Sequence, residues 1–155
     1  MKTDLPMREI RRRLSWVEFL SPLSEEEMVA FLRDASFLRL EEGKVLVVGP
    51  EEHAEWMLVV VAGQVQVYES SLRSGRELTL WVCGDGEAVC VTGLVPRWTR
   101  ELHLRALESS LLCQVGRDAL VFVHLLAQTR LKIGEGALDA GAVKRQIAHL
   151  GGFVD

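Results

Sequence analysis

Two short segments carry the residue types and spacing that could bind an anion. Gly84-Asp85-Gly86-Glu87 contains two glycines, which leave backbone N–H groups open to close approach. Arg100-Glu101 contributes a guanidinium, whose planar fork suits phosphate oxygens. The same residues also fit simpler structural roles, because glycines favour a tight turn and an Arg-Glu pair can lie solvated on a strand edge. Both interpretations stay open for these segments.

Residues for metal or nucleophilic chemistry are scattered. None of the four histidines lies within five positions of another, so the two-histidine strand motif of metal-dependent barrel enzymes is lacking. A single heme ligand, such as His53 or Cys83, remains an alternative. The chain has no G-x-S-x-G sequence, and we expect Cys90 to be a small core residue rather than a nucleophile. We therefore expect a protein that is not an enzyme, with no catalytic residues and no metal site.

The length and composition indicate one folded globular domain. The chain has 155 residues, of which 48% are hydrophobic and 26% are charged, and its net charge is −4. Three cysteines without C-x-x-C spacing predict reduced thiols and a cytoplasmic location. The longest apolar run, Trp56 to Ala62, is too short to span a bilayer, so no membrane association is expected.

Basic residues are concentrated at the N-terminus, where the first thirteen residues have a net charge of +3. Two interpretations are compatible with this segment. It can form a solvated helix face beside the acidic run Glu25 to Glu27, or it can act as an arm that binds nucleic acid. The overall negative charge provides no general attraction for nucleic acid, which favours the first interpretation.

Two helices are predicted before any strand. Ser24 followed by Glu27 forms a capping box, and helical spacing after it predicts a buried face that includes Met28, Val29, Leu32 and Ala35. An earlier amphipathic segment, Ile10 to Leu20, repeats apolar residues in the same manner. The residues expected to be buried in that segment are Leu14, Val17 and Leu20.

About eight short strands are predicted in the middle of the chain, because apolar runs and alternating residues are separated by turn signals. Further helices are predicted from Leu120 to Leu131 and from Leu138 to Leu150. No helical segment is predicted between the strands, so the pattern disfavours a parallel βαβ fold. The predicted fold class is α+β, mainly β: a double-stranded β-helix, or jelly-roll β-barrel, flanked by N-terminal and C-terminal helices. The residues that define the strands are Val45 to Val48, Trp56 to Val61, Val65 and Val67, Leu78, Leu80 and Val82, Leu102, Leu104 and Ala106, and Leu111, Cys113 and Val115.

The order of these elements and of several punctuating residues resembles the sensor domain of the catabolite-activator and fumarate/nitrate-regulator (CRP/FNR) family, which has the cyclic-nucleotide-binding fold. The resemblance runs from about residue 19 to residue 131. It implies a single domain over residues 1–155, with a helical entry and β-roll at about 14–118 and C-terminal helices at 119–150. The segments that carry it are Pro22 to Glu26, Gly43 to Leu46, Val61 to Val67, Ser74 to Leu78, Gly84 to Glu87 and Arg105 to Glu108.

In that family a Gly-Glu pair opens a short helix that faces a cyclic phosphate, and an arginine beside a small hydroxyl residue holds the phosphate. The resemblance therefore implies ligand-binding residues at Gly86, Glu87, Ala88, Arg100 and Glu101. It also implies a cyclic nucleotide, cAMP or cGMP, as the ligand, and no other cofactor.

This phosphate cassette departs from the family pattern. Glu101 stands where the family has serine, threonine or alanine, and a carboxylate about 4 Å from a phosphate costs roughly 4 kcal/mol at an effective dielectric near 20. The segment from Ala88 to Thr99 is longer than usual, and no glycine directly follows Glu87. The cassette is therefore predicted to be degenerate.

The resemblance implies an effector-sensing regulatory domain of a transcription regulator. The family continues into a helix-turn-helix domain, which the printed sequence lacks, so DNA contact is expected only through such an additional domain. The helices at 119–150 would be the dimerisation element, which predicts a homodimer unless they fold back on their own barrel. The alternative function is a ligand-free dimerisation or protein-interaction module on the same fold.

Overall fold

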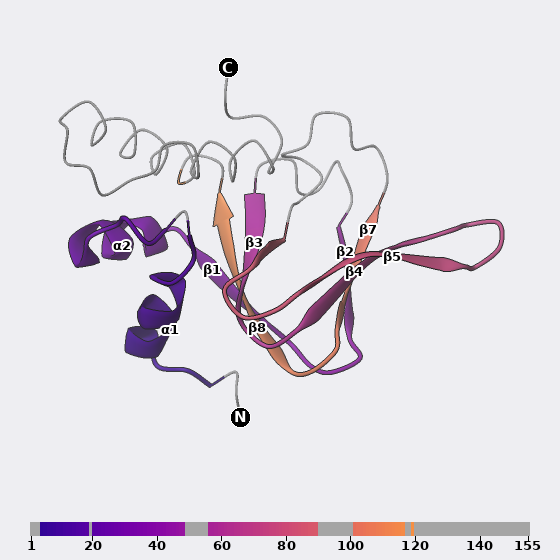
Figure 1. Cartoon of the computed structure of the whole chain (residues 1–155), viewed down its shortest axis with the longest axis horizontal. Coiled ribbons are helices and arrows are strands. Elements are labelled where there is room, and N and C mark those ends of the chain that lie inside the picture. The colour runs from indigo at the N-terminus through magenta and orange to yellow at the C-terminus, as the bar shows by residue number, and fades with distance from the viewer. Residues whose placement is uncertain (1–3, 19, 49–55, 90–100, 117–118, 120–155) are drawn as a thin grey trace, which may run out of the picture.

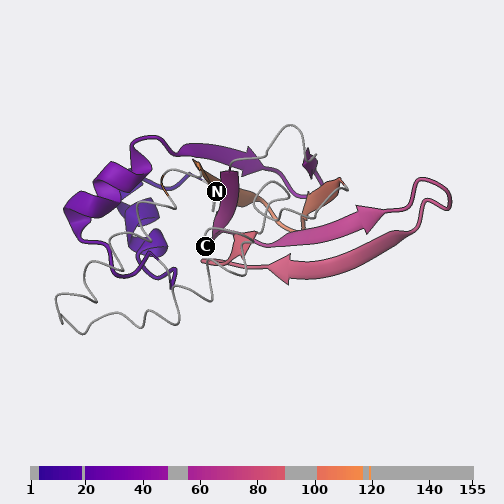
Figure 2. The ribbon, with the colours of Figure 1, turned by 90° about the horizontal axis from the view of Figure 1, so that it is seen from above.

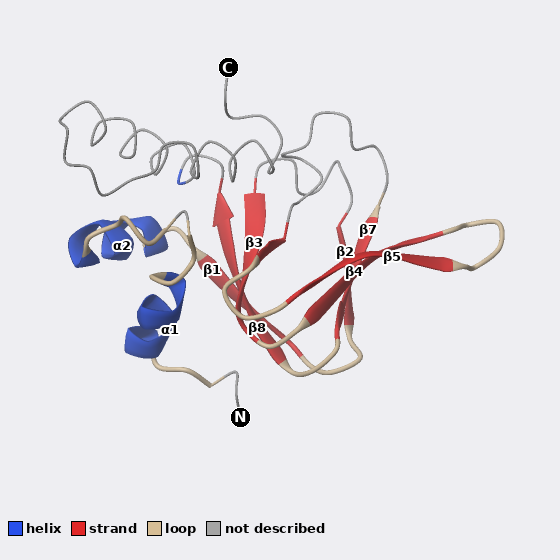
Figure 3. Ribbon diagram, viewed as in Figure 1, coloured by secondary structure: helices blue, strands red, loops and turns tan. Residues whose placement is uncertain are grey.

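The computed structural model describes residues 4–18, 20–48, 56–89, 101–116 and 119. Within these residues two helices precede a block of strands (Figures 1 and 3). The helices are α1 (Met7–Leu14) and α2 (Glu25–Leu32). The strands are β1 (Ser36–Leu40), β2 (Val45–Val48), β3 (Trp56–Ala62), β4 (Val65–Ser70), β5 (Glu77–Cys83), β6 (Ala88–Val89), β7 (Leu102–Ala106) and β8 (Ser110–Gly116). The prediction of a mainly β fold is confirmed.

The strands form two four-stranded antiparallel sheets. One sheet has the order β1-β8-β3-β6 and the other has the order β2-β7-β4-β5. The chain therefore moves repeatedly from one sheet to the other, which is consistent with the predicted jelly roll. The predicted C-terminal helices lie outside the described residues, apart from Ala119.

Local sequence explains how α2 begins. The Ser24 hydroxyl accepts a hydrogen bond from the Glu27 N–H at 3.1 Å, and the Glu27 carboxylate accepts one from the Ser24 N–H at 3.4 Å. The predicted capping box is thus confirmed. Met28 and Leu32 are buried as expected, but Val29 is 45% exposed and Phe31 is buried in its place. The buried stripe follows the spacing i, i+3 and i+4 from Met28, which excludes position 29.

The N-terminal helix packs on the sheet that contains β3. Ile10 and Leu14 point into the core, and α1 contacts β3 directly. Val17 and Leu20 are also buried, as the sequence predicts, although both follow the end of α1. This cover explains why β3 is apolar without alternation: side chains on both of its faces, from Met57 to Val61, are removed from water.

Strand β5 differs from its predicted pattern. Leu78, Leu80 and Val82 alternate in sequence and should share one face, yet Leu78 pairs with Glu69 while Val82 pairs with Gln66. A bulge between Val67 and Tyr68 in the β4–β5 pairing leaves Leu80 without a direct partner, so Leu78 and Val82 lie on opposite faces. Both are exposed, because the β4–β5 hairpin extends away from the rest of the strands (Figure 2).

At the corner between β3 and β4 the backbone of Gly63 lies close against Ser110, the first residue of β8. Gly63 has φ +112°, and a Cβ at this position would lie 2.2 Å from Ser110 Oγ and 2.7 Å from Ser110 Cα. The fully buried Ser110 hydroxyl accepts a hydrogen bond from the Gln64 N–H at 3.1 Å. The Leu107 N–H donates to the Gln64 carbonyl at 2.8 Å. Only glycine satisfies both the backbone conformation and the space at this corner.

We predict that Gly63→Ala destabilises the domain by about 3 kcal/mol, because the left-handed backbone conformation and the overpacking against Ser110 both add cost. The measurement is equilibrium urea denaturation. Gly75→Ala is the matched control, since Gly75 also has positive φ (+66°) but has nothing within 4 Å of its Cβ position. An equal loss of stability in the two variants would contradict the role assigned to Ser110.

Candidate ligand-binding site

The segment Gly84-Asp85-Gly86-Glu87 forms a turn that is bound to β3 by backbone hydrogen bonds. The Gly86 N–H donates to the Val60 carbonyl at 2.7 Å, and the Val60 N–H donates to the Glu87 carbonyl at 2.9 Å. Gly86 adopts φ +78°, which favours glycine at this position. The tight turn that the two glycines predict is therefore present.

Glu87 uses its carboxylate inside the turn. Glu87 Oε2 accepts a hydrogen bond from the Gly84 N–H at 2.7 Å, although the side chain is exposed. The next residues, Ala88 and Val89, pair with β3 as strand β6. The Gly86–Glu87 pair thus leads first into the short strand β6, because the bonds to Val60 place the chain beside β3. This arrangement is the turn glutamate that the sequence left as an alternative. The residues after Val89, where the helix that the resemblance implies would continue, lie outside the described residues.

Asp85 connects this turn to two other parts of the molecule. Asp85 Oδ1 accepts a hydrogen bond from the Gly63 N–H at 2.7 Å, and Asp85 Oδ2 lies 3.4 Å from Arg13 Nη1. The same Arg13 nitrogen also donates to the Val61 carbonyl at 3.5 Å. One carboxylate therefore ties the turn to the β3–β4 corner and to helix α1.

Arg13 is held in place by Glu9, one helical turn earlier. Glu9 Oε1 lies 3.0 Å from Arg13 Nε and 2.6 Å from Arg12 Nη2. Hydrogen bonding to Arg12, with a further contribution from Arg13, lowers the pKa of Glu9 from 4.5 to about 2. Glu9 consequently stays ionised over the pH range in which most carboxylates are charged. In this range it keeps the guanidinium groups of Arg12 and Arg13 oriented.

Cys83, one of the two residues considered as a heme ligand, is buried directly before the turn. Burial, with a contribution from the Glu87 carboxylate, raises the pKa of the Cys83 thiol to about 11. Cys113 is also a free buried cysteine, and burial raises its pKa to about 12. Both thiols are therefore neutral at physiological pH, a protonation state that disfavours nucleophilic attack and thiolate ligation.

Of the two residues predicted around position 100, only Glu101 is described. Glu101 is exposed and directly precedes β7, while Arg100 and Cys90 lie outside the described residues. The described residues therefore contain Gly86, Glu87, Ala88 and Glu101 of the predicted set. Gly86, Glu87 and Ala88 lie together at the start of β6.

A second charged cluster lies on the sheet β2-β7-β4-β5. The Arg105 guanidinium donates to both carboxylate oxygens of Glu77, at 2.7 and 2.9 Å, and to the Tyr68 hydroxyl at 3.1 Å. Its Cζ also lies 4.5 Å from the centre of the Tyr68 ring, and His103 stacks on that ring. The bond to Arg105 lowers the pKa of Glu77. This guanidinium is already compensated, so it holds β5 to β7 across β4 and offers no free charge to a ligand.

In the described parts of the chain, no group of three or more histidine, cysteine, aspartate or glutamate side chains is placed to hold a metal ion. None of the helices described there has the length and apolar character needed to cross a membrane.

Sequence reasoning missed Asp85 and Arg13 as positioning residues. An aspartate between two glycines indicates a turn that needs a side-chain acceptor, and this was the available signal. The partner at Gly63, 22 positions away, becomes apparent only when β3 and the turn are brought together.

Comparisons with solved structures show that the fold is that of cyclic-nucleotide-binding domains. The sensor domain of the transcriptional regulator DNR from Pseudomonas aeruginosa matches with a TM-score of 0.61 and 16% identity, over 84% of this chain and 95% of that one. A cyclic nucleotide-binding-like protein from Brucella abortus matches with a TM-score of 0.53 and 16% identity, over 74% and 97%. The regulatory subunit of a cAMP-independent protein kinase A from Trypanosoma brucei, as a mutant bound to cAMP, matches with a TM-score of 0.60 and 18% identity, over 91% and 52%.

At these identities the likeness concerns the fold alone. The chain spans about half the length of the kinase regulatory subunits that it matches. No protein-family model matches the sequence, and no curated protein sequence matches it.

We predict that Asp85→Ala lowers the free energy of unfolding by about 1–2 kcal/mol, because the Gly63 N–H loses its acceptor and Arg13 loses one charged partner. Asp85→Asn, which keeps an acceptor oxygen, should cost less. Urea denaturation measures both. Asp34→Ala is the control, since Asp34 is an exposed carboxylate without such contacts. The linking role of Asp85 would be disproved if Asp85→Ala destabilised the domain no more than Asp34→Ala does.

The Glu9 cluster predicts a pH dependence with a defined sign. Because the pKa of Glu9 is lowered in the folded state, ionised Glu9 stabilises the fold. This stabilisation is complete above pH 4.5 and is lost as the pH falls toward about 2. An NMR titration of the Glu9 carboxyl should report the lowered pKa, and Arg12→Gln should raise it toward 4.5. Arg11→Gln should leave it unchanged, because Arg11 makes no ion pair with Glu9. A Glu9 pKa near 4.5 in the unmodified protein would be the opposing result.

Proposed function

We propose that this chain is a non-enzymatic, effector-sensing regulatory domain of a transcription regulator similar to the CRP/FNR family. The observation that carries the proposal is the match to the DNR sensor domain, which extends over 95% of that chain with a TM-score of 0.61. The two-sheet topology, and the hydrogen bonds that join the turn at Gly86 to β3, support a domain with the same architecture as that sensor domain. In this proposal the domain acts in the cytoplasm as a homodimer, and DNA is contacted only by an additional domain.

The proposed ligand site comprises Gly86, Glu87, Ala88, Arg100 and Glu101. Arg100 would supply the positive charge, and the backbone around Gly86 and Ala88 would supply N–H donors. Glu101 adds an opposing charge that weakens the binding of a phosphate. Because the Glu87 carboxylate already accepts a bond from Gly84, its contribution to the site would be to shape the turn.

The proposed response starts at the same turn. An effector that binds one conformation of the turn more tightly than another shifts the population toward that conformation. Asp85 lies next to Gly86 and holds both the β3–β4 corner and Arg13 of α1. A displacement of the turn would therefore alter the contacts of α1 as well as those of β3.

A second candidate function is a ligand-free dimerisation or protein-interaction module. It is favoured by one observation: the Glu87 side chain is committed to its own turn. The Glu101 carboxylate, beside the arginine expected to bind a phosphate, is also consistent with a pocket that has lost its ligand. The helices at 119–150 would then be the functional element.

Thermal unfolding in the presence of cAMP or cGMP distinguishes the two functions. We expect millimolar nucleotide to stabilise the unmodified protein slightly and Glu101→Ser more strongly, because the substitution removes the carboxylate beside Arg100. A ligand at about 100 times its dissociation constant adds about 2.7 kcal/mol of stability. The measurement is the shift of the unfolding midpoint with nucleotide concentration.

Glu41→Ser serves as the matched control, with the same change of charge at an exposed site. Glu41 lies beside the turn that bonds to the opposite end of β7, where the Gly43 N–H donates to the Ala106 carbonyl at 2.8 Å. This variant should respond as the unmodified protein does. If neither the unmodified protein nor Glu101→Ser is stabilised, sensing of a cyclic nucleotide is rejected and the ligand-free module is favoured.

A further inference from the structure

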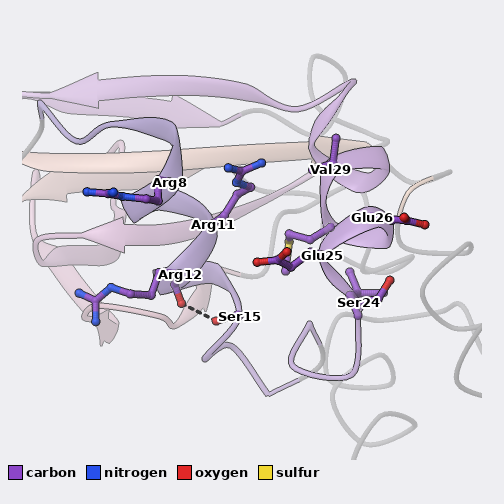
Figure 4. A pocket seen from close by; sticks show the side chains of 10 residues that line it. Arg8, Arg11, Arg12, Ser15, Ser24, Glu25, Glu26 and Val29 are labelled. Carbon is purple, nitrogen blue, oxygen red and sulfur yellow. Dashed lines mark hydrogen bonds between the residues drawn. The ribbon is translucent and has the colours of Figure 1, made fainter.

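A groove of about 700 Å³ lies between helices α1 and α2 (Figure 4). The residues that line it do not include those of the turn at Gly86. One wall is formed by α1 and carries Arg8, Arg11 and Arg12. This basic wall results from the packing of α1, because Ile10 and Leu14 are buried against the sheet and leave the arginines on the outer face. The groove is large enough to hold several side chains of a partner.

The charges on this wall are only partly compensated. Arg12 pairs with Glu9 at 2.6 Å and lies 4.8 Å over the exposed ring of Trp16. Among the residues that the structure describes, Arg8 and Arg11 have no carboxylate within ion-pair distance. These two exposed guanidinium groups can therefore pair with negative charges brought by a partner.

The opposite wall combines apolar and acidic groups. Met28 forms a buried part of the lining, and Val29 is 45% exposed beside it. Glu25 and Glu26, at the first turn of α2, also line the groove. In Figure 4 the arginines lie on the α1 side of the gap and Glu25 lies on the α2 side.

Exposed apolar side chains extend this surface beyond the groove. Met7 is 48% exposed and Trp16 is 69% exposed, and both belong to α1 or the turn that follows it. Arginine, tryptophan and methionine are enriched in protein interfaces, and tryptophan and arginine are frequent among the few residues that contribute most of the binding energy. A partly compensated basic wall beside such residues therefore has the composition of a protein-binding surface.

We propose that the α1–α2 groove is a docking site for a short acidic and apolar helical segment of a partner protein. Such a segment would place its carboxylates against Arg8 and Arg11 and its apolar side chains against Met28 and Val29. Each groove helix has eight residues, which is about two helical turns, so a partner helix of two turns or more can follow them. A nucleic acid fits less well, because its evenly spaced phosphates would also face Glu25 and Glu26.

The test uses the full chain and a fluorescently labelled amphipathic peptide of about four helical turns, with glutamates on one face and leucines on the other. Fluorescence anisotropy should show binding that weakens as salt concentration rises. The double variant R8E/R11E should bind at least about tenfold more weakly. The control R73E/R76E changes charge equally on the β4–β5 turn and should bind as the unmodified protein does. Val29→Asp should also weaken binding.

Three results would overturn the proposal. The first is no binding of the glutamate peptide at millimolar concentration. The second is equal binding to the unmodified protein and to R8E/R11E, with both proteins showing the same thermal unfolding. The third is tighter binding of a DNA duplex than of the peptide, with the same loss in R8E/R11E, which would assign the surface to nucleic acid. A peptide with lysine in place of glutamate should not bind.

Discussion

The structure depends on the close approach of Gly63 to Ser110 at the corner between β3 and β4. At this corner the chain leaves the sheet that contains β3 and enters the sheet that contains β4. A side chain at position 63 would collide with the backbone of Ser110, so the crossing is possible only without a Cβ. The Gln64 N–H and carbonyl are then satisfied by Ser110 and Leu107, which keeps the buried polar groups of the corner paired.

The candidate site is built around the same corner. The Asp85 carboxylate accepts the Gly63 N–H, and Arg13 binds both Asp85 and the Val61 carbonyl. The turn at 84–87, helix α1 and the two sheets therefore share one hydrogen-bonded junction. In the proposed function, a displacement of the turn would reach α1 through this junction, because Asp85 and Arg13 belong to different elements. It also explains why the carboxylates of Asp85 and Glu87 act as structural groups in the described residues.

Two sets of arginines have opposite consequences for function. Arg105 is enclosed by Glu77 and Tyr68, and its charge stabilises the projecting β4–β5 hairpin. Arg8 and Arg11 instead remain on the outer face of α1, because the apolar residues of that helix are turned toward β3. Within the described residues, the basic cluster noted at the N-terminus is therefore only partly paired with carboxylates, and its arginines lie on helix α1. It forms one wall of a groove whose second wall is apolar and acidic.

The sequence by itself determined the mainly β class, the capping box at Ser24, and the strands that contain Val65 and Val67 and the residues Leu102 to Ala106. These features follow from local periodicity and from hydrogen bonds between residues a few positions apart. Three features were decided only by the tertiary structure. They are the sheet faces on which Leu78 and Val82 lie, the strand pairing that follows Glu87, and the hydrogen-bond and ion-pair partners of Asp85. The bulge in the β4–β5 pairing changes the sheet face of the side chains beyond it. The Asp85 carboxylate accepts a hydrogen bond from Gly63, a donor that lies near it only in the folded chain. Both effects depend on contacts between distant segments, which local spacing does not encode.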